Sequence, residues 1–224
     1  MIRSVIRPVI RPVIRSIISG DGGAVYVDPV PGFLLKYLMD GTDSSLVPIM
    51  SPTVVTGIDL PDLLATEFNG VDQFYTANAD SATVATIGSG PFTITFRIKT
   101  SIASARTIME FGDPGSSSGF KVNTRGVGGL TLKVDGTSLN LLDDRFLDDV
   151  WLHVAITSTG SGGTLEYFVD SIANRTTRTL PTYTFTDTND FMIADTNLPA
   201  ILDDIRIYDF VLTQGQITAL YNNN

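Results

Sequence analysis

The chain has 224 residues, of which 43% are apolar and 17% are charged, a composition ordinary for a globular protein with a buried core. It contains no cysteine, which excludes disulfides, thiolate metal sites and cysteine nucleophiles, and no apolar run of roughly 18 residues that would predict a membrane-spanning segment. The net charge of −9 argues against a general attraction to nucleic-acid phosphates.

Residues 1–20 are predicted to form an extended arm. The stretch "IRSVIRPVIRPVIRSII" at residues 2–18 repeats a four-residue pattern, Ile-Arg-x-Val or Ile-Arg-x-Ile. Pro8 and Pro12 would each remove a helical hydrogen bond, and each pushes the preceding residue toward extended angles. On a strand, the isoleucines at even positions share one face with serine and proline, and the arginines share the other face with valine. The residues predicted to dock the arm are Ile2, Arg3, Ile6, Arg7, Ile10, Arg11, Ile14 and Arg15.

This repeat favours an assembly arm over the alternatives. An arginine at every fourth position interrupts the apolar stretch that a signal peptide needs, and the prolines oppose the helix of a transit peptide. A disordered tail is usually poor in isoleucine and valine. The whole chain has a charge of −9 and the arm alone +4, so the remainder carries −13. We expect the arm to dock on other proteins of an assembly, in a homo-oligomer or on a lattice, with no nucleic acid and no membrane insertion.

The rest of the chain is predicted to be a linker at residues 21–32 and one all-β domain at residues 33–224. Turn signals such as "GDPGSSSG" at 112–119 separate short strands, among them residues 92–100, 130–136, 151–157 and 165–170. The strand at 92–100 alternates apolar and polar residues, which predicts one buried and one solvated face. Residues 212–221 have helical spacing, with Thr213 as N-cap and Gln216 three residues later. One helix among many strands indicates a two-sheet sandwich or jelly roll.

Several motifs resemble, in the same order, those of laminin G-like and pentraxin-like domains of the concanavalin A-like lectin/glucanase superfamily. They include "TEFNGVDQFYT" (66–76), "PFTITFRIKT" (91–100), "VWLHVAIT" (150–157) and "ILDDIRIYDFVLTQGQITALYN" (201–222). The resemblance covers about residues 33–222. It implies a jelly-roll sandwich of two antiparallel sheets, here with an extended N-terminal arm and one short C-terminal helix. The family binds sugars, proteins or calcium, so the fold alone does not settle the function.

The sequence lacks the pattern expected of a catalytic site. Jelly-roll glycosidases place paired carboxylates close together on one strand, whereas Glu67, Glu110 and Glu166 are predicted on separate strands. His153, the only histidine, lies beside Trp151, the only tryptophan, in a segment that resembles an interior strand of the family. Packing accounts for both residues better than acid–base chemistry beside a sugar. We therefore predict that the protein is not an enzyme.

The resemblance also implies a candidate calcium site. In related domains an ion lies between the loop equivalent to "FNG" (68–70) and an acidic pair equivalent to Asp203 and Asp204. Here Asn69 stands where an aspartate is usual, which removes one ligand charge, and Asp72 could compensate for it. A plain turn with solvated aspartates is the alternative interpretation.

The function predicted from these features is that of a virion structural protein, most simply of a tailed bacteriophage. It would be a capsid decoration, head fibre or tail-associated protein, anchored by its arm and displaying the sandwich outward. The alternative is a carbohydrate-binding adhesin or module at a bacterial surface, with a host surface glycan as ligand. Aromatic candidates for a sugar platform, each also interpretable as a core residue, are Phe74, Tyr75, Tyr183 and Tyr208.

Overall fold

The computed structural model describes residue 30 and residues 32–37, 47–49, 53–56, 64–115, 118–126, 128–141, 144–173, 177–186, 191–195 and 197–222. The predicted arm, residues 1–20, lies outside these ranges, so its assembly role stays a prediction. From the predicted linker, Val30 and Gly32 are described.

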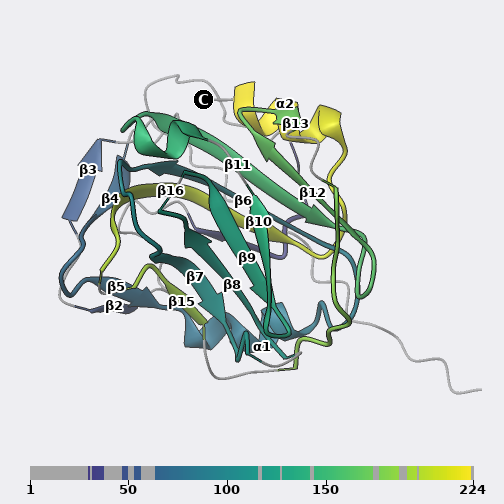
Figure 1. Cartoon of the computed structure of the whole chain (residues 1–224). Helices are drawn as coiled ribbons and strands as arrows, with labels where there is room; N and C mark the ends of the chain where they lie inside the picture. Colours follow the sequence, from purple (N-terminus) through teal and green to yellow (C-terminus); the bar gives the residue numbers. More distant parts are fainter. Residues whose placement is uncertain are drawn as a thin grey trace, which may run out of the picture.

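The described strands form two antiparallel sheets that face each other (Figure 1). Among the described residues, the larger sheet has nine strands in the order β13-β12-β11-β6-β16-β4-β3, with β1 pairing with β16 and β14 pairing with β12. Its strands are β1 (Leu35–Tyr37), β3 (Thr53–Thr56), β4 (Leu64–Asn69), β6 (Phe92–Lys99), β11 (Trp151–Ser158), β12 (Thr164–Val169), β13 (Ile172–Ala173), β14 (Arg178–Thr179) and β16 (Pro199–Tyr208).

In the described part of the chain, the smaller sheet has seven strands in the order β10-β9-β8-β7-β15-β5-β2. Its strands are β2 (Val47–Ile49), β5 (Phe74–Thr76), β7 (Thr107–Phe111), β8 (Phe120–Thr124), β9 (Leu130–Val134), β10 (Thr137–Leu141) and β15 (Phe191–Ile193). The predicted architecture, a sandwich of two antiparallel sheets, is confirmed.

The main apolar core lies between the two sheets. Alternate side chains of β6 and β11 in the larger sheet meet alternate side chains of β8 and β9 in the smaller one. Five aromatic rings in this core have neighbouring centroids 4.6–6.3 Å apart, in the tilted, edge-on and stacked pairs usual for aromatic packing. These rings belong to Phe92, Phe111, Phe120, Tyr183 and Phe185.

The helix predicted at residues 212–221 is present as α2 (Gln214–Asn222). The backbone N–H of Gln216 donates to the Thr213 hydroxyl at 3.3 Å, and the Gln216 side-chain oxygen accepts from the Thr213 N–H at 2.9 Å. This reciprocal capping box fixes where α2 begins, as the sequence indicated. The other described helical segments are α1 (Ser81–Ala85) and two short 3-10 helices, η1 (Asn78–Asp80) and η2 (Asp144–Leu147).

The prediction of a solvated face on the strand at residues 92–100 was wrong. This strand is β6, and its residues Thr93, Thr95 and Arg97 are at most 2% exposed. The cause is α2, which packs on the outer face of the larger sheet and places Ile217 and Leu220 in a second apolar cluster. The other buried members of this cluster are Val30, Ala155, Phe168, Tyr208 and Leu212. The larger sheet is therefore buried on both faces along β6.

Candidate functional site

A row of charged and polar side chains crosses the outer face of the larger sheet. The strand register places His153 of β11 opposite Arg97 of β6, and Arg97 opposite Asp203 of β16. All three side chains are at most 2% exposed. Burial of a charged group is costly unless the group is paired and hydrogen-bonded, so the partners of this row decide its role.

A β-bulge in β16 adds a second acid to this row. The register with β6 shifts between Asp203 and Arg206, and Asp204 has a left-handed φ of +44°. Its carboxylate accepts a hydrogen bond from Nε of Arg206 at 2.7 Å and lies 3.8 Å from Nζ of Lys36. Burial raises the pKa of Asp204, but the charge and hydrogen bond of Arg206 and the charges of Lys36 and Arg97 together outweigh it, so the pKa lies below its ordinary value. Asp204 is therefore held as an ionised partner of Arg206.

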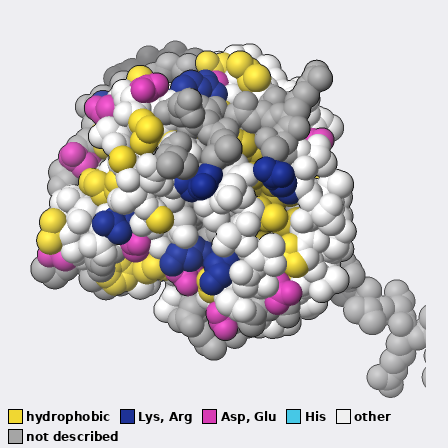
Figure 2. Space-filling model, in the orientation of Figure 1, with side chains coloured by type: hydrophobic (Ala, Val, Ile, Leu, Met, Phe, Trp, Pro, Cys, Tyr) yellow, Lys and Arg dark blue, Asp and Glu magenta, His cyan; other side chains and the backbone are white. Residues whose placement is uncertain are grey.

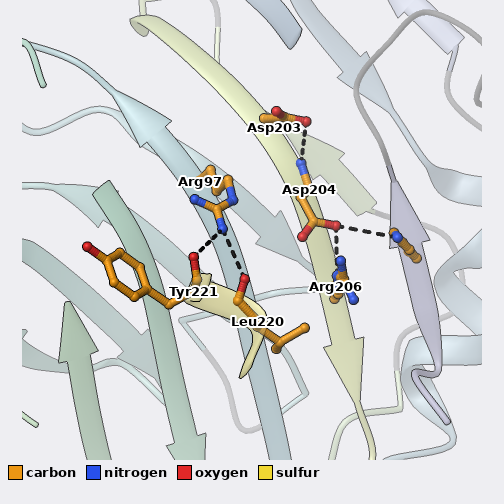
Figure 3. A network of polar contacts seen from close by, with 7 residues as sticks. Arg97, Asp203, Asp204, Arg206, Leu220 and Tyr221 are labelled. Carbon is orange, nitrogen blue, oxygen red and sulfur yellow. Dashed lines mark hydrogen bonds and ion pairs between the residues drawn. The ribbon is translucent and has the colours of Figure 1, made fainter. Parts of the chain in front are cut away.

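Arg97 connects the row to α2 (Figure 3). Its Nη2 donates to the backbone oxygen of Leu220 at 3.1 Å and to that of Tyr221 at 3.4 Å, both in the last turn of the helix. The last carbonyls of a helix lack partners within the helix and carry its partial negative charge, so a buried guanidinium stabilises them in both respects. The ionic network, defined as Lys36, Arg97, Asp203, Asp204 and Arg206, therefore fastens α2 to the sheet.

His153 is buried beside this network. Neither of its ring nitrogens has a hydrogen-bond partner among the described residues, and its ring centroid lies 6.2 Å from that of Tyr221. Burial and the positive charges of Arg97 and Arg206 lower the pKa of His153 to about 3, although Asp204 acts in the opposite sense. The imidazole is thus neutral at pH 7 and packs as an interior side chain, which matches the packing interpretation of the sequence.

The structure does not bring the four predicted calcium ligands together. The pairing of β4 with β16 places Asn69 opposite Pro199, four residues before Asp203 and so roughly 13 Å away along the strand. Asn69 and Asp72 contact each other, since Nδ2 of Asn69 donates to Oδ1 of Asp72 at 3.1 Å, while Asp204 pairs with arginine. In the described ranges, no three His, Cys, Asp or Glu side chains are placed to hold a metal ion. A single calcium site shared by Asn69 and Asp72 with Asp203 and Asp204 does not match this geometry. Calcium binding by Asn69 and Asp72 alone, or by Asp203 and Asp204 alone, stays a prediction.

The aromatic residues considered for a sugar platform belong to the apolar clusters. Tyr75, Tyr183 and Tyr208 are at most 6% exposed, and Phe74 is partly buried against the main core. The three tyrosines therefore offer no open face to a sugar, which matches their core interpretation, and the ring of Phe74 is only partly covered.

The three glutamates lie on three different strands, as the sequence predicted. Glu67 is on β4 and Glu166 on β12, separated by three strands of the larger sheet or roughly 19 Å. Glu110 is on β7 of the smaller sheet, where its Oε2 lies 2.9 Å from Nζ of Lys121. These glutamates do not form the closely spaced carboxylate pair of a glycosidase.

The outer face of the smaller sheet is the best candidate for ligand contact. The register aligns Ser138 of β10, Lys133 of β9, Lys121 of β8 and Glu110 of β7 in one row. Because the alternate residues of these strands enter the core, this row points away from it. Figure 2 shows several Lys and Arg side chains over this sheet, with acidic ones among them. We call this surface the open face and define it as Glu110, Lys121, Asn123, Thr131, Lys133, Ser138 and Asn140.

A second row of the open face consists of neutral hydrogen-bonding groups. Asn140, Thr131 and Asn123 lie opposite one another on β10, β9 and β8. The Thr131 hydroxyl donates to Oδ1 of Asn140 at 3.4 Å, whereas Oδ1 of Asn123 is buried and accepts no hydrogen bond from any described residue. A buried acceptor without a donor is costly, and because this oxygen is buried, contact with a ligand falls to the exposed Asn140 of the same row. Sequence reasoning missed this face because the alternation in "FKVNT" and "LTLKV" shows an outward side but not which sheet α2 covers.

The chain belongs to the family described as the concanavalin A-like lectin/glucanases superfamily, whose profile matches residues 70–218. This match covers the strands of the open face and most of the strands and helix around the ionic network. No protein with a curated function is similar to the chain by sequence. None of the described helices is long and apolar enough to cross a membrane.

Solved structures of toxin binding domains have a similar fold. The receptor binding domain of the botulinum neurotoxin C/D mosaic serotype aligns with a TM-score of 0.68 at 13% identity, over 86% of this chain and 51% of that one. The binding domain of Paraclostridial Mosquitocidal Protein 1 aligns with a TM-score of 0.59 at 14% identity, over 79% of this chain and 47% of that one. A structure of botulinum neurotoxin type C aligns with a TM-score of 0.58 at 17% identity, over 79% of this chain and 46% of that one. The cell entry of that toxin depends on interaction with two ganglioside molecules. The chain thus spans about half the length of these neighbours, and the likeness shows the fold.

The buried histidine predicts an acid-dependent loss of stability. The pKa of His153 is about 3 in the folded chain and 6.5 for an unperturbed histidine. Between pH 3 and pH 6.5 the histidine is therefore protonated in the unfolded chain but neutral in the folded chain. Stability is full above pH 6.5 and falls as the pH drops, by about 2 kcal/mol between pH 7 and pH 5. Urea unfolding at the two pH values measures this difference. His153→Phe, which cannot titrate, should remove it, and an equal loss in both proteins would contradict the assignment.

Proposed function

We propose that the protein is a non-enzymatic binding module that contacts a surface glycan through the open face. The observation that carries this proposal is the difference between the two outer faces of the sandwich. Along β6 the larger sheet is covered by α2 and the ionic network, whereas the smaller sheet presents side chains that remain partly or fully exposed. Polar side chains on adjacent strands can follow an extended ligand, and membership of a lectin-like family supports this reading.

The charge of the open face favours an acidic glycan. Lys133 and Lys121 bring two positive charges to a chain with a net charge of −9, and only Glu110 opposes them within the face. A carboxylate, sulfate or phosphate group on a sugar would form charge-assisted hydrogen bonds with the lysines. The exposed Asn140 amide and the partly exposed Thr131 hydroxyl would contact neutral hydroxyl groups of the same polymer.

We place this module in a virus particle, anchored by residues 1–20 and displaying the sandwich outward. The support is the repeated arm, whose isoleucines and arginines suit docking on another protein, together with a binding-type fold. The parts of a bacteriophage that fit are a capsid decoration, a head fibre or a tail-associated protein. A carbohydrate-binding adhesin at a bacterial surface is the second candidate, and it uses the same open face.

Replacing the two lysines of the open face should weaken glycan binding. We expect the Lys121→Ala, Lys133→Ala double variant to bind acidic glycans on a printed array at least about tenfold more weakly, because each lost charged hydrogen bond contributes roughly 1.5–3 kcal/mol. Lys99→Ala is the matched control, since Lys99 lies on the other sheet and pairs with the exposed Asp149. Equal binding by all three proteins, or binding to no glycan, would contradict the proposal.

The virion setting predicts that incorporation depends on the arm. Replacing Ile6, Ile10 and Ile14 by Ser should remove the chain from purified particles while leaving its circular dichroism unchanged, because the arm is expected to dock on a partner rather than on its own sandwich. Peptide mass spectrometry of particles from complemented infections measures this. Arg→Lys changes in the arm serve as charge-preserving controls. Absence of the unmodified chain from particles would favour the adhesin.

A further inference from the structure

The outer edge of β10 is an open sheet edge. Residues 137–141 form backbone hydrogen bonds with β9 but with no other described strand, and Thr137, Ser138 and Asn140 are exposed. Proteins usually protect such edges with proline, lysine, a bulge or a very short strand. The edge strand β2 contains Pro48, and β12 is flanked by the two-residue strands β13 and β14. β10 has five residues and none of these protections.

The turn before β10 determines which of its backbone groups point outward. Asp135 and Gly136 connect β9 to β10 with φ values of +48° and +68°, which is the pattern of a two-residue type I′ turn. The flanking pair of such a turn, Val134 and Thr137, is hydrogen-bonded, and the bonding then alternates along the strand. The N–H and C=O groups of Ser138 and Asn140 therefore point away from β9. They offer two donors and two acceptors to an incoming strand.

The arm sequence matches an edge of this kind. In an extended segment, successive N–H groups point to opposite edges, and both prolines, Pro8 and Pro12, are at even positions. The odd-numbered residues form one edge of the extended arm, and each of them has a backbone N–H. The even-numbered residues form the other edge, which has no N–H donor at Pro8 or Pro12. The arm is thus able to pair on one side, and its second side is blocked against further pairing.

We propose that β10 accepts the arm of a second copy of this chain as an additional antiparallel strand. This inference rests on the proposed assembly role of the arm and names its partner. In an antiparallel pair, odd arm residues that bond to Ser138 and Asn140 lie on the same face as those two side chains. The even arm residues, with the isoleucines, then lie beside Leu139 and Leu141 on the core face.

The antiparallel direction follows from burial. A parallel strand that bonded through the same odd residues would place the arginines beside Leu139 and Leu141, where their charges would be desolvated. The antiparallel arrangement instead extends the core with isoleucine and leaves the arginines solvated on the outer side of the sheet, so their charges are not desolvated. Each copy has one arm and one β10 edge, so the contact is head-to-tail and forms a ring or a chain.

Proline at Ser138 tests the acceptor edge. Ser138→Pro removes an N–H that points outward and leaves the hydrogen bonds to β9 intact, so the sandwich should keep its circular dichroism. Light scattering on a sizing column should show an oligomer for the full chain and for Ser138→Ala, and at least tenfold weaker self-association for Ser138→Pro. If Ser138→Pro unfolds the chain, Asn140→Pro makes the same test at the second outward N–H. A monomeric full chain, or equal association of all variants, would overturn the proposal.

Mixing two defective proteins separates the arm from the edge. The Ile6→Ser, Ile10→Ser, Ile14→Ser variant keeps its β10 edge, and Ser138→Pro keeps its arm, so each alone should be a monomer. Mixed at equal concentration they should form a heterodimer through the one remaining arm and the one remaining edge. No association of the mixture would overturn docking between copies, whereas the glycan proposal is tested by the Lys121→Ala, Lys133→Ala variant, whose two sites neither protein of the mixture changes. The two proposals therefore fail separately.

Discussion

The hydrogen bonds from Arg97 to the last turn of α2 are the contact on which the arrangement of this molecule depends. They attach the C-terminal helix to the middle of the larger sheet and place a buried positive charge against the negative end of the helix. The bulge at Asp204 supplies a second ion pair within the same buried row, with Arg206. Burial of these charges is acceptable only because each has partners, so the row and α2 depend on each other.

Attachment of α2 makes the two faces of the sandwich unequal. The helix and the second apolar cluster remove the outer face of β6 from solvent, and they bury His153, which would otherwise be the natural candidate for chemistry. Contact with ligands is left to the smaller sheet, whose open face is polar and whose edge strand β10 is unprotected in the described part of the chain. Ligand binding and assembly are thus proposed for neighbouring parts of one sheet, with the other sheet serving as the scaffold.

The sequence predicted local structure well, because local structure depends on patterns within a few residues. Alternation located β6, β9, β11 and β12, and Thr213 with Gln216 located the start of α2. Alternation gave the wrong result for the outer face of β6. The polar residues at 93, 95 and 97 predicted a solvent-exposed face, but they lie under α2, a helix more than a hundred residues later in the chain. Calcium binding by Asn69, Asp72, Asp203 or Asp204 stays a prediction, and the strand register that separates Asn69 from Asp203 cannot be read from either motif.

The most direct test of this account is hydrogen–deuterium exchange of residues 214–222 in Arg97→Ala. Lys99→Ala is the control on the same strand and face, because its ion pair with Asp149 is solvent-exposed and contributes under about 1 kcal/mol. Loss of the Arg97 hydrogen bonds should cost roughly 1.5–3 kcal/mol and speed exchange in α2 by about tenfold or more, with the strands of the smaller sheet unchanged. Unchanged exchange of α2 in Arg97→Ala would contradict the claim that this contact closes the outer face of the larger sheet.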